Sequence, residues 1–236
     1  MAFALGAAAG SFLGVAVERL PKGRSRCENC KRQLKWWENI PLISFVFLKG
    51  KCRTCRSPIP YWLPLIEIAG GMGGVWVIRE VGEIGIIGGL GVMLILLTLT
   101  WVFFSDLVSG TVPDVAILIG AVGAVIYRLP FTVQDLLWPA AAAGGFFYFL
   151  VLITRGRGMG TGDVTLAAFL GLWLGWPKIL LAVWLAFILG AVAGLVLIGL
   201  KLKRFGQTIP FGPFLIAASI ITAIYIKNDW TALIGI

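Results

Sequence analysis

Long runs of apolar residues, separated by short polar connectors, fill most of the 236-residue chain. A helix that crosses a bilayer needs about 20 mostly apolar residues, and the runs predict about eight such helices. The segment Gly175-Trp176-Pro177 separates the sixth helix, which is the shortest, from the seventh. The pattern therefore predicts an all-α polytopic membrane protein with transmembrane helices at 2–19, 61–79, 84–104, 112–128, 135–153, 163–176, 178–200 and 209–227.

The composition supports this prediction. Hydrophobic residues make up 59% of the chain and charged residues 13%, whereas a soluble domain has roughly 45–50% apolar and about 25% charged residues. The excess apolar surface must face lipid. Glycines four residues apart, such as Gly6 and Gly10 or Gly70 and Gly74, would let helix backbones approach closely inside the bilayer. The first apolar run has neither a basic segment before it nor a cleavage site after it, so we expect a retained helix.

Lysine and arginine are distributed unequally among the connectors. If the N-terminus lies outside and the helices alternate in direction, the cytoplasmic connectors are 19–60, 105–111, 154–162 and 201–208, which contain 16 of the 20 basic residues. Basic connectors favour the cytoplasmic side, so this distribution orients the protein. It also accounts for the net charge of +9 without a nucleic-acid partner, and the expected partner is the lipid bilayer.

The longest connector predicts a small cytoplasmic domain at 20–60, between a first transmembrane helix at 1–19 and a transmembrane bundle at 61–236. A segment of roughly 40 residues is too small to be stable on a hydrophobic core alone. All four cysteines of the chain lie in it, as two C-x2-C pairs. Two such pairs favour a tetrahedral Zn²⁺ site with no open position, and hence a structural role. The predicted ligands are Cys27, Cys30, Cys52 and Cys55.

Two disulfides are the alternative for these cysteines. The charge distribution places the connector in the cytoplasm, where thiols stay reduced, and this favours the metal. A bound metal would also supply the folding free energy that so short a segment lacks.

Two aspartates lie at the cytoplasmic border of predicted helices. Asp106 follows the third helix, and Asp163 begins the sixth, after Gly160-Thr161-Gly162. Two neighbouring carboxyl groups cannot both ionise easily, so one keeps a proton and acts as an acid while the other acts as a base. Such a pair could activate a water to attack a peptide carbonyl. The chain contains no histidine, so this pair is its best acid–base machinery.

Each acid also has a structural interpretation. Asp163 could cap the sixth helix, and Asp106 could simply end the third. Asp114 is expected to be an early-turn partner of a helix dipole. Glu67, inside the second predicted helix, has no assigned role and could contact either the basic connector or the substrate. Two other functions stay open. A transporter or channel could use the aspartates to carry ions, although such sites usually lie near the bilayer midplane, and a scaffold could carry the zinc domain without chemistry.

At these residues the chain resembles the type IV prepilin peptidases, which are membrane aspartyl proteases of the GxGD class. The resemblance covers nearly the whole chain and is carried by an ordered set of segments at 10–13, 19–21, 27–30, 36–42, 50–55, 64–67, 112–114, 158–163 and 209–214, together with Asp106. It implies that Asp106 and Asp163 are the catalytic pair. It also implies that prepilins or pseudopilins are cleaved at the cytoplasmic face of the bacterial inner membrane, after a short basic leader that ends in glycine.

The resemblance further implies a second activity. Many members of the family methylate the new N-terminal residue with S-adenosylmethionine, and the cysteine-bearing loop is typical of those members. The residues themselves show no glycine-rich fingerprint for this cofactor, so its binding residues stay unassigned. Two positions depart from the family pattern: Thr165 stands where a lysine is usual, and Gly14 where asparagine is frequent. Loss of the lysine would alter the pH optimum.

Overall fold

The computed structural model describes residues 1–18, 26–27, 29–129, 132–156, 159–202 and 209–225. These residues form helices and isolated β-bridges, without a strand, so the all-α prediction is confirmed for them. In chain order the elements are α1 (Ala2–Glu18), the 3-10 helix η1 (Trp36–Asn39), α2 (Ile43–Phe47), α3 (Trp62–Ser109), α4 (Asp114–Tyr127), α5 (Val133–Thr154), α6 (Thr161–Leu174), α7 (Lys178–Gly199) and α8 (Gly212–Tyr225).

Three of these helices, α3, α5 and α7, are long and apolar enough to cross a membrane. The helices α4, α6 and α8 and the first part of α1 are apolar but shorter. The structure thus supports a membrane protein, while the count of about eight spans and the division into 1–19, 20–60 and 61–236 stay predictions.

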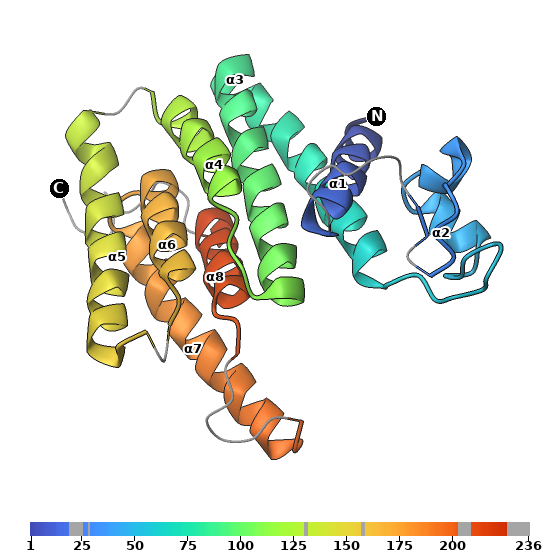
Figure 1. Cartoon of the computed structure of the whole chain (residues 1–236). Coiled ribbons are helices and arrows are strands. Elements are labelled where there is room, and N and C mark those ends of the chain that lie inside the picture. Colours follow the sequence, from blue (N-terminus) through green and yellow to red (C-terminus); the bar gives the residue numbers. More distant parts are fainter. Residues whose placement is uncertain (19–25, 28, 130–131, 157–158, 203–208, 226–236) are drawn as a thin grey trace.

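The second and third predicted helices belong to one element, α3, which bends at Gly85 (Figure 1). Gly85 has a φ of 80° and a ψ of 177°, a conformation that a residue with a side chain rarely adopts. We call residues 62–84 the first arm of α3 and residues 86–109 its second arm. The sequence pattern placed the break at 80–83, slightly too early, because Glu80 and Glu83 interrupt the apolar run there. In the structure both acids are helical, and Glu80 accepts a hydrogen bond from Trp76 Nε1 at 2.8 Å.

Helix α1 packs along the first arm of α3 through the glycines that the sequence singled out. A Cβ atom on Gly10 would lie 2.5 Å from the carbonyl oxygen of Ile66, and one on Gly74 would lie 2.6 Å from that of Ala2. Since these neighbours are backbone atoms, only glycine allows the two helices to come so close.

The second arm of α3 packs against α4 and α8, while α6 packs against α4 and α5, and α7 against α8. Ile95 and Val102 of α3, Leu166 and Phe169 of α6 and Leu215 of α8 are buried in the shared core. Because consecutive helices run in opposite directions, the end of α3 and the starts of α4, α6 and α8 lie at one end of the bundle, at the bottom of Figure 1.

Candidate functional site

Asp106 lies in the last turn of α3, which Gly110 ends with a left-handed φ of 64°. Its side chain faces the start of α8 and is only 6% exposed, with the Oδ2 atom fully shielded from solvent. Gly212, the first residue of α8, lies against this carboxyl group: a Cβ atom on Gly212 would lie 2.6 Å from Asp106 Oδ2. The absence of a side chain at residue 212 therefore makes room for the carboxyl group.

Asp163 is the third residue of α6, because the helix begins at Thr161, two residues earlier than the apolar pattern indicated. Its Oδ2 atom accepts a hydrogen bond of 3.2 Å from the backbone N–H of Gly160. The sequence allowed Asp163 to cap this helix. In the structure it caps the helix from the third helical position and not from the residue before the helix. Gly162 brings this turn close to the α3–α4 connector, since a Cβ atom there would lie 2.9 Å from Val112 Cβ.

The two aspartates lie at the same end of the bundle, Asp106 in the last turn of α3 and Asp163 in the first turn of α6. They come from helices that pack on common neighbours: α3 and α6 both contact α4 and α8. Asp106 is buried and Asp163 is partly buried. Two such carboxyl groups, if brought into contact, can share a proton, as acid–base hydrolysis by a carboxyl pair requires.

The other acids singled out by the sequence have different surroundings. Asp114 is exposed in the first turn of α4, as expected for a partner of the helix dipole. Glu67 contacts the basic connector, one of the two partners considered for it: its Oε2 atom accepts a hydrogen bond of 2.8 Å from the backbone N–H of Leu42. Thr165, which replaces the family's usual lysine, donates its hydroxyl hydrogen to Gly162 O within its own helix.

The four cysteines form one cluster, with all sulfur atoms within 4.8 Å of one another. Two turns of the same geometry build it. The N–H of Cys27 donates to Arg32 O, and the N–H of Cys52 donates to Ser57 O, each at 2.9 Å. In both turns the residue after the second cysteine has a left-handed φ of 55°; these residues are Lys31 and Arg56. The C-x2-C repeat in the sequence is thus a repeat in structure.

The geometry of the cluster fits a tetrahedral metal. Cys27 Sγ and Cys55 Sγ lie 3.7 Å apart, and a regular tetrahedron with Zn–S bonds of about 2.3 Å has sulfur atoms about 3.8 Å apart. All four thiols are free, and a disulfide would need about 2.05 Å. Hydrogen bonds from the hydroxyl and backbone N–H of Ser57 lower the pKa of Cys55 to about 6, which favours the thiolate that a metal requires.

Glu38 joins two parts of the same region through its carboxyl group, a role that the sequence did not indicate. Its buried carboxyl group pairs with Arg32 Nη2 at 2.7 Å and accepts the N–H of Lys35 at 2.7 Å. Burial opposes ionisation, but these hydrogen bonds outweigh it and hold the pKa of Glu38 below its ordinary value. Beside it, the guanidinium of Arg53 lies 5.4 Å from the ring centre of Trp37. Glu38 therefore ties the first cysteine turn to η1 as a buried ion.

A groove of about 870 Å³ opens between the two arms of α3 and α8. Apolar side chains line most of it, including Leu99, Phe103 and Ile216, and Arg79 and Glu83 lie at its far end. Phe104, two residues before Asp106, also lines it. The groove therefore extends along the second arm of α3 to within one helical turn of Asp106.

Comparisons with known proteins give a consistent result. A family model described as the bacterial peptidase A24 N-terminal domain matches residues 4–81, and one described as the type IV leader peptidase family matches residues 93–195. The bend of α3 at Gly85 lies between the two matches, in residues 82–92. No solved structure gives a significant match.

Three bacterial relatives illustrate the similarity, and each carries the name prepilin leader peptidase/N-methyltransferase. The protein from Stutzerimonas stutzeri is 32% identical over 95% of this chain and 89% of its own length. The protein from Pseudomonas aeruginosa is 31% identical over 94% and 88%, and that from Burkholderia pseudomallei strain 1026b is 32% identical over 95% and 84%.

Proposed function

Because the chain belongs to the type IV leader peptidase family, we propose that it removes the short basic leader from prepilins or pseudopilins. Cleavage follows the last glycine of the leader, at the cytoplasmic face of the bacterial inner membrane, and Asp106 and Asp163 carry it out. One observation of the structure supports this most: two carboxyl groups from distant parts of a histidine-free chain lie at one end of the bundle, at the end of α3 and the start of α6.

In the proposed reaction the two carboxyl groups share one proton. The ionised group takes a proton from a water molecule, whose oxygen attacks the peptide carbonyl carbon. The protonated group then gives its proton to the leaving amine, the carbon–nitrogen bond breaks, and the water proton restores the starting state. The position of both aspartates at the end of the bundle argues against ion carriage, which usually uses acids near the midplane.

Co-expression with a prepilin tests the pair. Asp106→Asn and Asp163→Asn are each expected to abolish leader removal, because an amide can neither take nor supply the shared proton. The matched control is Asp114→Asn, which changes an exposed acid at the same end of the bundle and is expected to leave cleavage intact. Normal processing by either of the first two variants, with the protein folded in the membrane, contradicts the assignment.

We place the peptidase chemistry in residues 61–236, next to a membrane helix at 1–19, and a structural Zn²⁺ on the four cysteines of a domain at 20–60. Cys27, Cys30, Cys52 and Cys55 would hold the metal, whose contribution is folding free energy for this domain. Four sulfur ligands leave no position for a reacting water, so the metal takes no part in peptide cleavage.

We also propose that the protein methylates the mature N-terminus with S-adenosylmethionine, as the second half of its relatives' name states for them. The expected outcome is a single added methyl group on the N-terminal amine of the processed pilin, read by mass spectrometry. Processing with purified protein and cofactor that yields only unmethylated product would restrict the protein to proteolysis.

A further inference from the structure

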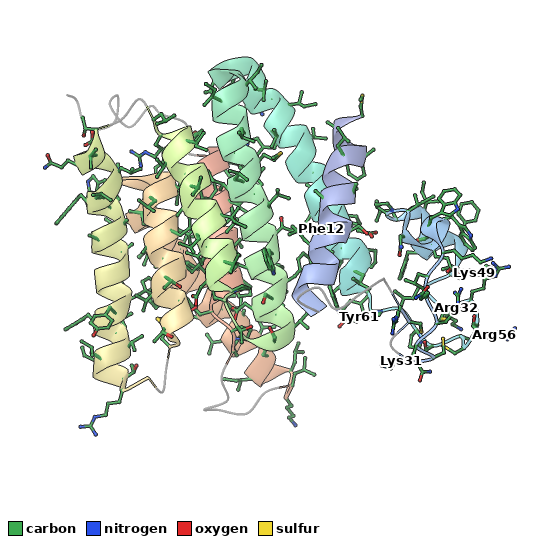
Figure 2. All side chains as sticks on the ribbon, turned by 45° about the horizontal axis from the view of Figure 1, so that its top comes forward. Phe12, Lys31, Arg32, Lys49, Arg56 and Tyr61 are labelled. Carbon is green, nitrogen blue, oxygen red and sulfur yellow. The ribbon has the colours of Figure 1, made fainter. Side chains whose placement is uncertain are left out.

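The segment that carries the cysteines has an unusual surface. We call its described residues, 26–27 and 29–60, the loop unit. The whole connector at 20–60 contains ten lysines and arginines against two glutamates, so even four thiolates around a divalent metal leave a large positive excess. One of the two acids, Glu38, is buried and already paired with Arg32. Figure 2 shows Lys31, Arg32, Lys49 and Arg56 spread over the loop unit.

The same unit exposes large apolar side chains. Trp36 is 80% exposed, Val46 72% and Phe47 79%, and Ile43 is also exposed. Three of these four residues belong to α2, a helix of five residues. A soluble surface rarely gathers such side chains, whereas basic residues beside exposed aromatic and aliphatic ones are typical of segments that lie in a membrane interface.

The position of the loop unit agrees with an interface. Figure 1 shows it beside α1 and the first arm of α3, and its vertical position in this view overlaps that of the two helices. The hydrogen bond from the N–H of Leu42 to Glu67 Oε2, at 2.8 Å, fixes the start of α2 to α3. Glu67 lies five residues inside α3, about 7.5 Å along the helix axis. The headgroup layer of a leaflet is of similar thickness, about 5–8 Å, so the start of α2 lies near its inner boundary if α3 enters the layer at Trp62.

We propose that the loop unit rests on anionic phospholipid headgroups of the leaflet into which α1 and α3 insert. The exposed side chains of α2 enter the interface, and Lys31, Lys49 and Arg56 contact lipid phosphates. Tyr61, directly before α3, is also exposed. Tyrosine and tryptophan are enriched at the membrane–water interface, so Tyr61 is expected to lie there as well. The proposal concerns how the loop unit is held at the membrane and does not depend on the peptidase activity.

Hydrogen–deuterium exchange of the full-length, metal-loaded protein tests it. The protein is reconstituted in nanodiscs of phosphatidylcholine alone, or with part of it replaced by phosphatidylglycerol. Backbone amides of residues 43–49 are expected to exchange more slowly in the anionic nanodiscs, and high salt is expected to remove this difference because exposed charges are screened.

Charge variants give the matched comparison. Lys49→Gln with Arg56→Gln is expected to reduce the slowing by up to about fivefold for each cation removed. The control is Arg155→Gln with Lys201→Gln, which removes two exposed cations of the cytoplasmic connectors outside the loop unit. All four positions have a left-handed φ between 50° and 57°, so any effect of glutamine on the backbone conformation is the same in the test pair and in the control pair. Retained metal shows that the loop unit stays folded.

Three results overturn the proposal. The first is equal exchange of residues 43–49 in neutral and anionic nanodiscs. The second is an equal effect of the control pair, which would indicate general attraction of the whole protein to negative charge. The third is slowing that appears only when an acidic prepilin segment is added, since the surface would then serve the substrate and not the lipid.

Discussion

Gly212 determines how closely the backbone of α8 approaches the Asp106 carboxyl group. We predict that Gly212→Ala lowers the rate of leader cleavage on the order of 100-fold, the cost of displacing a reacting group by about 1 Å. The added Cβ atom would meet Asp106 Oδ2 at 2.6 Å, and a carboxyl group can move more easily than a packed helix. The measurement is the rate of prepilin processing by purified protein.

Gly190→Ala is the control for this substitution, because its Cβ atom would lie 3.5 Å from the Phe211 ring, an ordinary contact. If Gly212→Ala processes prepilin at the rate of the control, the Asp106 carboxyl is not held in place by α8.

Glu38 is a single acid with a structural role, the ion pair with Arg32. Because its pKa is held below the ordinary value for glutamate, its ion pair with Arg32 contributes stability fully above about pH 4.3. That contribution is lost only as the pH falls through the lower folded-state pKa. The pair therefore supports the cysteine turns throughout the physiological range.

Helix α1 and the first arm of α3 form one element pair that depends on glycine. We predict that Gly10→Val destabilises the protein by about 1–3 kcal/mol, the usual cost of forcing extra atoms into a packed interface. The Cβ atom would lie 2.5 Å from Ile66 O, and a helix carbonyl cannot turn away without losing its own hydrogen bond. Thermal unfolding of the detergent-solubilised protein measures the change.

Gly145→Val provides the comparison for the helix pair, since a Cβ atom at Gly145 has no neighbour within 4 Å among the described residues. Both variants make the same change in intrinsic helix propensity, from glycine to valine. Equal unfolding temperatures for the two would show that α1 is not held by close backbone contact.

At the scale of the whole molecule, the cysteine cluster and the two aspartates belong to separate parts. The loop unit lies beyond α1, whereas Asp106 and Asp163 lie in the bundle on the other side of the first arm of α3 (Figure 1). We predict about one zinc per purified chain, and we expect its removal by a chelator to unfold the loop unit alone. Hydrogen exchange should then rise over residues 29–60 and stay unchanged over 86–109 and 161–174.

A native preparation without zinc would refute the metal assignment. Increased exchange at residues 161–174 after metal removal would instead show that the loop unit supports the aspartate pair. Cys27→Ser with Cys52→Ser, which removes one ligand from each turn, is expected to reproduce the effect of the chelator.

The sequence by itself determined the all-α class, the positions of most helices and the cysteine cluster. Apolar runs, glycine spacing and the C-x2-C repeat are local patterns, and local patterns fix which segments are helical and which residues can chelate together. Asp106 and Asp163 stood out because a carboxylate at the border of an apolar helix has few structural reasons to be there.

Tertiary structure decided what depends on contacts between distant segments. It joined two predicted helices into α3, whose bend lies at Gly85, and it set α8 against Asp106 through Gly212. It also gave Glu67 its partner, the N–H of Leu42, 25 residues away in the chain. No periodicity encodes such contacts, because they depend on which surfaces pack together and on the hydrogen bonds that buried polar groups must then find.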